Sequence, residues 1–118
     1  MTVGADDQAA HVALETIRRL REAFPIQNIT GGASNISFGM PARHMLNANF
    51  LVAAITSGMN MPITDPTHAD LRLALLTANI FLGRDKRTRH FMQYCRQTSR
   101  AHGKRRYAQN DNANTTVS

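Results

Sequence analysis

Residues 26–32, with the sequence IQNITGG, form a short β-like run. A helical run follows over residues 41–57, in which Pro41 suits the first turn of a helix and Gly58 suits the cap at its carboxyl end. A second β-like run, residues 59–64, comes directly after that glycine. A strand, a crossover helix and a second strand in one sheet form a right-handed unit with parallel strands. This part of the chain therefore predicts an α/β fold.

The same alternation extends in both directions along the chain. Residues 2–5 have the pattern of a further strand, residues 6–24 predict an amphipathic helix, and residues 65–82 predict another. A repeat of roughly 30 residues is typical of βα units. Parallel strands need both faces covered, and a complete (β/α)8 barrel takes about 250 residues. The pattern predicts three parallel strands in a barrel segment or a small open α/β unit.

The size and composition of the chain exclude several classes of protein. Its 118 residues, 42% of them hydrophobic, suffice for the core of a single domain. No run of 18 apolar residues occurs, and the amino-terminal residues lack the basic and apolar regions of a signal peptide, which predicts a cytoplasmic protein. The single cysteine, Cys95, allows neither an internal disulfide nor a thiolate zinc cage. The fold is therefore expected to rest on packing alone.

The positive charge lies almost entirely in the last third of the sequence. Residues 84–118 carry nine Lys and Arg against two Asp, whereas the whole chain has a formal net charge of +6. We expect a barrel-like domain over residues 1–100 and a tail over residues 101–118 that is basic, then polar and disordered. The charge pattern by itself predicts a solvated helix face. Binding of nucleic acid is the alternative, although no RNA- or DNA-binding motif is present.

The polar residues that follow the predicted strands are the candidates for chemistry, because barrel enzymes place their working residues there. Asp6 follows the first run, and Asp65 follows the third. The second run is followed by the most informative loop, in which Ser34 and Asn35 come after two glycines. On composition alone, such residues more often make turns and helix caps than binding sites. The five histidines show no metal-binding spacing, so no bound metal is predicted.

Four segments together resemble a known family. They are Gly31-Gly-Ala-Ser-Asn-Ile-Ser-Phe-Gly39 with Arg43, Leu46-Asn-Ala-Asn-Phe-Leu51, Gly58-Met-Asn-Met-Pro-Ile-Thr-Asp-Pro66 and Leu82-Gly-Arg-Asp85. Over about residues 2–97 the chain resembles the pterin-binding methyltransferases, namely the methyltetrahydrofolate:corrinoid protein methyltransferases and the folate domain of cobalamin-dependent methionine synthase. The resemblance implies a TIM barrel like that of dihydropteroate synthase, of which this chain holds only the last three βα units.

The resemblance implies transfer of the N5 methyl group of methyltetrahydrofolate to the cobalamin or other corrinoid of a partner protein. Asn35 matches the family's catalytic asparagine, which assists the chemistry at N5. The residues implied to bind the substrate are Ser34, Phe38, Arg43, Asp6 and Asp65. A carboxamide is not a general acid near neutral pH, so Asn35 is expected to orient N5 and stabilise charge through a hydrogen bond.

The resemblance also implies what this chain lacks. The family clamps the pterin ring with residues of earlier barrel strands, and those strands are absent, so the chain alone is expected to be inactive. Activity is expected with a complementing chain that supplies the amino-terminal barrel units, and a homo-oligomer is the alternative assembly. A pterin-binding protein similar to dihydropteroate synthase is a second reading of the fold. The pair Ser34-Asn35 favours the methyltransferase branch, because the synthase shows a Ser-Arg-Lys type of sequence in a late loop.

Overall fold

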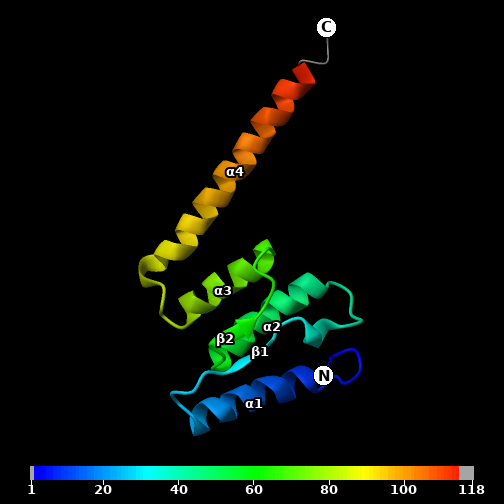
Figure 1. Ribbon diagram of the computed structural model, residues 1–118, viewed down its shortest axis with the longest axis vertical. Helices are drawn as coiled ribbons and strands as arrows, with labels where there is room; N and C mark the ends of the chain where they lie inside the picture. Colours follow the sequence, from blue (N-terminus) through cyan, green and yellow to red (C-terminus); the bar gives the residue numbers. More distant parts are fainter. Residues whose placement is uncertain (1, 115–118) are drawn as a thin grey trace. The chain divides into compact units, whose positions relative to one another are not determined.

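The computed structural model describes residues 2–114, and side chains as far as residue 103. The chain divides into two compact units, Met1–Arg84 and Asp85–Ser118. The elements of the first unit, labelled in Figure 1, are α1 (Ala9–Ala23), β1 (Thr30–Gly32), the 3-10 turn η1 (Asn35–Ser37), α2 (Arg43–Ser57), β2 (Met61–Ile63) and α3 (Ala69–Phe81). The second unit contains η2 (Lys86–Thr88) and α4 (Arg89–Asn114).

The predicted α/β character is confirmed, but the prediction of three strands is wrong. β1 and β2 form a two-stranded parallel sheet in which Thr30 pairs with Met61 and Gly32 with Ile63. Residues 2–5 form a turn instead of a third strand. The Val3 amide donates to the Ile36 carbonyl (2.9 Å), and the Thr2 hydroxyl donates to the Phe38 carbonyl (2.9 Å). The segment is therefore tied to the loop after β1, where it has no strand to pair with.

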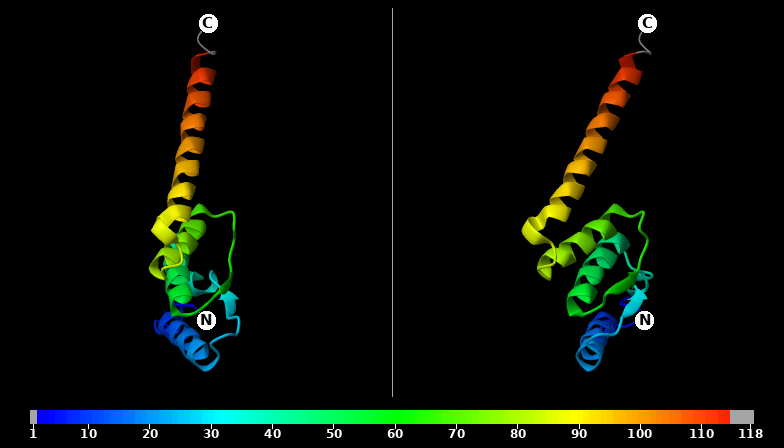
Figure 2. Two further views of the ribbon diagram at one scale, coloured as in Figure 1. Left: turned by 90° about the vertical axis from the view of Figure 1, so that its left-hand side faces the viewer. Right: turned by 60° about the vertical axis from the view of Figure 1, so that its left-hand side comes forward.

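The two faces of the sheet differ sharply. Side chains alternate along a strand, so Ile29 and Ala33 share the face that points toward the helices, and both are buried. Met61 and Ile63 lie on the other face and are 52% and 67% exposed. Both views in Figure 2 show α2 and α3 on one side of the strands. The helices thus cover one face of the parallel sheet and leave the other open.

The core lies between the sheet and the helices, with α2 between α1 and α3. Its larger cluster brings together residues of α2 and α3 and the end of β1: Ala33, Leu51, Ile55, Leu71, Ala74 and Ala78. A smaller cluster joins α1 to the strands and to α2: Ile17, Ile29, Ala54 and Met59. Leu51 is completely buried, so the apolar spacing of α2 accounts for most of the packing in this unit.

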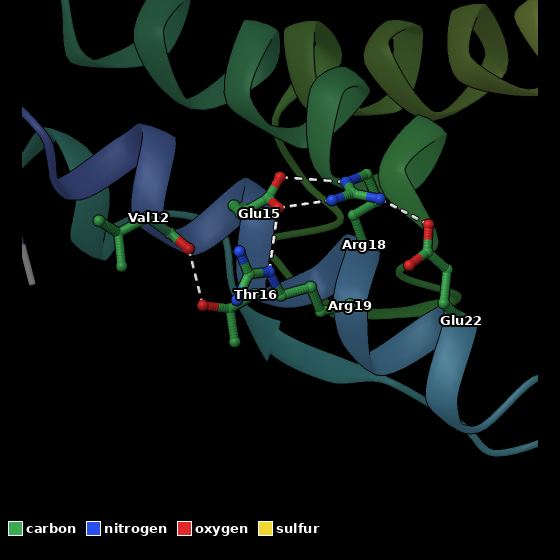
Figure 3. Close-up of polar contacts among 6 residues, drawn as sticks. All are labelled: Val12, Glu15, Thr16, Arg18, Arg19 and Glu22. Carbon is green, nitrogen blue, oxygen red and sulfur yellow. Dashed lines mark hydrogen bonds and ion pairs between the residues drawn. The ribbon is translucent and has the colours of Figure 1, made fainter.

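The outer face of α1 carries a cluster of charged residues, shown in Figure 3. Glu15 accepts hydrogen bonds from Arg18 and Arg19, and Arg18 also pairs with Glu22. These spacings of three and four residues place the side chains next to one another on a helix. The hydrogen bonds from Arg18 and Arg19 lower the pKa of Glu15 to about 2. The cluster is exposed to solvent and serves the helix itself rather than a binding site.

Glycines follow two of the helices, and Gly58 does so as predicted. Gly58 follows α2 with a φ of 130°, and Gly83 lies just beyond α3 with a φ of 70°, both in the region that favours glycine. The Gly58 carbonyl accepts two hydrogen bonds from the Arg21 guanidinium, at 3.0 and 2.7 Å. Arg21 thereby joins the last turn of α1 to the end of α2.

The second unit begins with a buried carboxylate. Asp85 accepts hydrogen bonds from the backbone amides of His90 and Phe91, both at 3.0 Å, and contacts the His90 ring at 3.1 Å. Burial opposes its ionisation, but these hydrogen bonds outweigh burial and lower the pKa of Asp85. Asp85 thus satisfies amide groups that the first turn of α4 leaves unpaired.

The carboxyl-terminal part of the chain is helical for longer than its composition suggests. α4 passes residue 100 and ends at residue 114, and the division into two compact units falls after Arg84. Disorder of residues 101–118 stays a prediction, and its last part, residues 115–118, lies outside the described residues. Within residues 2–114, no helix is both long enough and apolar enough to cross a bilayer.

Candidate functional site

A pocket of about 370 Å³ lies where the carboxyl ends of β1 and β2 meet the first turns of α2 and α3. Its walls come from the two strand ends and the two helices: Ala33, Ser34, Arg43, His44, Asn47, Thr64, Asp65, His68 and Leu71. Parallel strands bring their carboxyl ends to one edge of a sheet, which is why loops far apart in the sequence meet here.

The loop after β1 is held by a buried polar pair. The Ser37 hydroxyl donates to the side-chain oxygen of Asn47 at 2.5 Å, and both residues are buried. Ser37 lies at the end of η1 and Asn47 on the second turn of α2, so this hydrogen bond fixes the loop against the helix that follows it. The asparagine-rich run of the sequence thus supplies a structural partner for the loop. Sequence analysis did not assign a role to either residue.

Arg43 is a basic group of the site that is hydrogen-bonded to the loop after β1. Its Nε donates to the Ser37 hydroxyl at 3.2 Å, and one terminal nitrogen donates to the Ser34 carbonyl at 3.3 Å. The guanidinium lies 5.7 Å from the centre of the Phe38 ring, which is within the range of a cation–π contact. These contacts hold Arg43 across the loop that carries Ser34, at the wall of the pocket.

Asn35 is next to the pocket but is not part of its lining. Its side chain is exposed and lies over Gly32. A β-carbon added to Gly32 would be 3.4 Å from Nδ2 of the Asn35 side chain. Gly32 shares the open face of the sheet with Ile63, its partner in the register. The side-chain amide of Asn35 is therefore at the carboxyl end of β1, on the face of the sheet that α1, α2 and α3 do not cover.

Asp65 occupies the corresponding place after β2. One of its oxygens accepts hydrogen bonds from the Thr67 amide (2.9 Å) and hydroxyl (2.7 Å), and the other lies 3.8 Å from Nε2 of His68. The hydrogen bonds from Thr67, aided by nearby His68, lower the pKa of Asp65. Asp65 makes a tight turn before α3, whose cap residue is His68. The Asp65 carboxylate also lines the pocket, and its lowered pKa favours the charged form.

The structure brings only some of the predicted site residues together. Ser34, Arg43 and Asp65 share the pocket, with Asn35 beside it. Phe38 is 69% exposed; its ring contacts Arg43, and its backbone amide donates to the Asn35 carbonyl at 3.4 Å. Asp6 is not in the lining: its carboxylate accepts the Gln8 amide at 2.9 Å, just before α1.

Besides Asn47, three further polar residues of the pocket had no role in the sequence analysis. The rings of His44 and His68 lie 4.5 Å apart at an angle of 37°. The Thr64 hydroxyl oxygen is buried and has no hydrogen-bond partner within the described residues. No local motif could have indicated the histidine pair, because 24 positions separate its members and only the βαβ topology brings them together. Among residues 2–103, no three His, Cys, Asp or Glu side chains are arranged to hold a metal ion.

Comparison with known proteins supports the resemblance over part of the chain. No family model matches. The chain is 40% identical over 81 residues to the methylcorrinoid:tetrahydrofolate methyltransferase of Eubacterium limosum. The match covers 69% of this chain and 30% of that enzyme, so the chain spans about a third of the length of this relative. The matched part thus supports similarity to a methyltransferase that acts on a corrinoid and a folate.

Proposed function

We propose that this chain is the carboxyl-terminal portion of a methyltransferase that moves a methyl group between N5 of tetrahydrofolate and a corrinoid carried by a partner protein. One observation carries the proposal: the Ser34-Asn35 loop lies at the carboxyl end of β1, beside Asp65 at the end of β2, in a chain 40% identical over 81 residues to such an enzyme. The complete reaction would need further βα units that these 118 residues do not contain.

The methyl group could move from the folate to the corrinoid or in the opposite direction, and the residues of this chain do not decide between the two. The sequence interpretation took methyltetrahydrofolate as the methyl donor, whereas the name of the relative has the methylcorrinoid first, as the donor. A reaction and its reverse pass through one transition state, so the residues that assist transfer from N5 also assist transfer to it. We therefore propose the same roles for either direction.

Asn35 is the residue we assign to the reacting nitrogen. The tetrahydrofolate amine is a poor leaving group unless a proton or a strong hydrogen bond stabilises the electron pair that N5 gains. The Asn35 amide is exposed on the open face and is not used in a side-chain hydrogen bond within the described residues. A carboxamide donates without releasing a proton, so its role would be to orient N5 and stabilise charge.

Ser34 and Arg43 would fix the position of the folate beside this amide. Ser34 lies at the strand end and lines the pocket, and its carbonyl already binds the guanidinium of Arg43. A guanidinium held at both the loop and the Ser37 hydroxyl loses little further freedom when a substrate arrives. Such preorganisation favours a bound geometry close to that of the transition state.

The open side of the sheet supports the need for a complementing chain. The Met61 amide donates to the Ile29 carbonyl and the Ala33 amide to the Ile63 carbonyl, so alternation directs the backbone groups of Thr30 and Gly32 to the outer edge of β1. That edge pairs with no other strand in residues 2–114. A two-stranded parallel sheet with unpaired outer edges and one exposed face is suited to accept further βα units.

The experiment is a complementation assay with the Asn35→Ala variant. The 118-residue chain would be mixed or co-expressed with a chain containing the preceding part of the Eubacterium limosum relative, and transfer of the methyl group to a corrinoid protein would be followed. We expect kcat to fall about 100-fold in Asn35→Ala, with a much smaller change in KM. Asn49→Ala is the matched control, because Asn49 is exposed on α2 and its side chain donates only to the Met45 carbonyl within its own helix. Equal rates for the two variants would reject the role of Asn35.

A further inference from the structure

The pocket at the strand ends has the composition of an anion site rather than that of a pterin site. We propose that it binds an oxyanion through His44, His68 and Arg43. On the proposed function, on which this assignment of the ligand rests, the oxyanion is a carboxylate of the glutamyl tail of the folate.

Basic groups outnumber acidic ones in the lining of the pocket. Arg43, His44 and His68 face a single carboxylate, that of Asp65. One oxygen of this carboxylate is already bound to the Thr67 amide and hydroxyl. An arriving oxyanion would therefore meet three basic side chains and one carboxylate, whose negative charge the hydrogen bonds from Thr67 leave in place.

The start of α2 adds to this preference. α2 begins with Arg43 and His44, has no acidic residue in its first turn, and has no side-chain cap. The backbone amides of residues 43–45 donate to no acceptor among the described residues. Basic side chains at the amino end of a helix are unfavourable next to its dipole, and an anion relieves that conflict.

The buried hydroxyl of Thr64 supplies an independent observation. Its oxygen is inaccessible to solvent and has no partner within the described residues, although a buried polar atom of this kind normally has one. Thr64 lines the same pocket, on the strand end opposite Ser34. The pocket wall therefore includes a residue whose buried polar atom has no partner among the described residues.

The two histidine rings are expected to make the binding of an oxyanion in the pocket depend on pH. The two rings lie 4.5 Å apart, and an oxyanion bound beside them favours their charged form. The other charged groups that line the pocket are Arg43 on α2 and Asp65 on the loop after β2, and Asp70 lies in the first turn of α3. Binding of the oxyanion is thus expected to tighten as the pH falls.

The tail, rather than the pterin ring, suits this exposed position. Arg43 and His44 are exposed and the His68 side chain is 42% exposed, so the pocket is open to solvent. The glutamyl carboxylates of a folate remain solvated when bound in such a pocket, whereas the reacting ring needs a drier environment. Ser34 lines the pocket and Asn35 comes next in the chain on the open face, so one ligand could reach both places.

The test is a titration of the full 118-residue chain followed by the histidine ring signals in NMR spectra. The probes are pteroyl-tri-γ-glutamate, pteroylmonoglutamate, 6-methylpterin, which has no carboxylate, and inorganic phosphate. We expect the triglutamate to bind more tightly than the monoglutamate, to shift the signals of His44 and His68, and to bind more tightly at about pH 6 than at about pH 8. 6-Methylpterin should leave both rings unchanged.

Variants of the two histidines sharpen the test. We expect His44→Gln and His68→Gln each to weaken the binding of pteroyl-tri-γ-glutamate by about two- to fivefold, the range of partly exposed charge pairs, and to reduce its pH dependence. His11→Gln is the matched control, because His11 is an exposed histidine on α1 outside the pocket. Equal effects of the three variants, or equal binding of 6-methylpterin, would overturn the proposal. Shifts caused by phosphate but not by the pteroylglutamates would overturn the assignment to the folate tail.

This test separates the anion site from the methyl transfer. If the complemented protein transfers methyl groups at the same kcat/KM with the mono- and triglutamate forms of its substrate, and the histidine signals do not move, the anion site is rejected while the proposed function stands. If the histidine signals move but the complemented protein transfers no methyl group, the proposed function fails while the oxyanion site stands.

Discussion

The two faces of the β1–β2 sheet are made of similar residues but have opposite surroundings. On the helix side, Ile29 and Ala33 are buried under α1, α2 and α3. On the open side, Met61 and Ile63 are apolar yet more than half exposed. Parallel sheets are normally covered on both faces, and their strands are apolar on both for that reason. The difference indicates that the folding of this unit uses one face, and we propose that the other face receives further βα units.

The largest expected effect is on the covered face. Leu51→Ala should lower the free energy of unfolding by about 2–5 kcal/mol, because Leu51 is completely buried in the core between α2 and α3. Urea unfolding followed by circular dichroism measures it. A loss below about 1 kcal/mol would show that the covered face is not the one that stabilises the unit.

Gly58 tests whether the packing extends to the ends of the helices. A β-carbon at this position would lie 2.7 Å from the β-carbon of Arg21, and its φ of 130° is strained for other residues. Gly58→Ala should cost about 1–3 kcal/mol of unfolding free energy. Gly103→Ala is a useful comparison, since nothing lies within 4 Å of its added carbon and its φ is helical, and it should not destabilise the protein.

A substitution at Ser37 tests whether the loop after β1 contributes to the stability of the unit, as the covered face of the sheet does. Ser37→Ala would leave the buried side-chain oxygen of Asn47 without its donor and should cost about 1–3 kcal/mol. It also removes one of the two anchors of Arg43. Thermal unfolding measures the first effect. An unchanged melting temperature would mean that the loop is held by other contacts.

The smallest effect is expected on the open face. Ile63→Ala should change the stability of the isolated chain by less than about 0.5 kcal/mol, because its side chain is 67% exposed. The same substitution should weaken association with a complementing chain that covers this face. Analytical ultracentrifugation of the mixed chains would measure that association, and equal association of the variant and the native chain would argue against the open face as the contact surface.

The helices and the parallel strands were predictable, since apolar spacing and capping glycines are local signals. The helix ended by Gly58 and the pairing of β1 with β2 illustrate this. The turn at residues 2–5 was not, because a four-residue apolar run has no local feature that separates a strand from a segment bound to a loop. The same limit applies to the site. Ser34 and Asp65 follow their strands in the sequence, whereas the contact between His44 and His68 depends on two helices being placed side by side.

The most direct test of the account is the rate of methyl transfer between tetrahydrofolate and a corrinoid protein, measured for this chain alone and with a complementing chain that supplies the preceding βα units. The open face and bare edge of the sheet predict no turnover by the 118-residue chain alone, and turnover that depends on Asn35 after complementation. Robust turnover by the isolated chain, or a complemented protein whose rate is unchanged by Asn35→Ala, would contradict it.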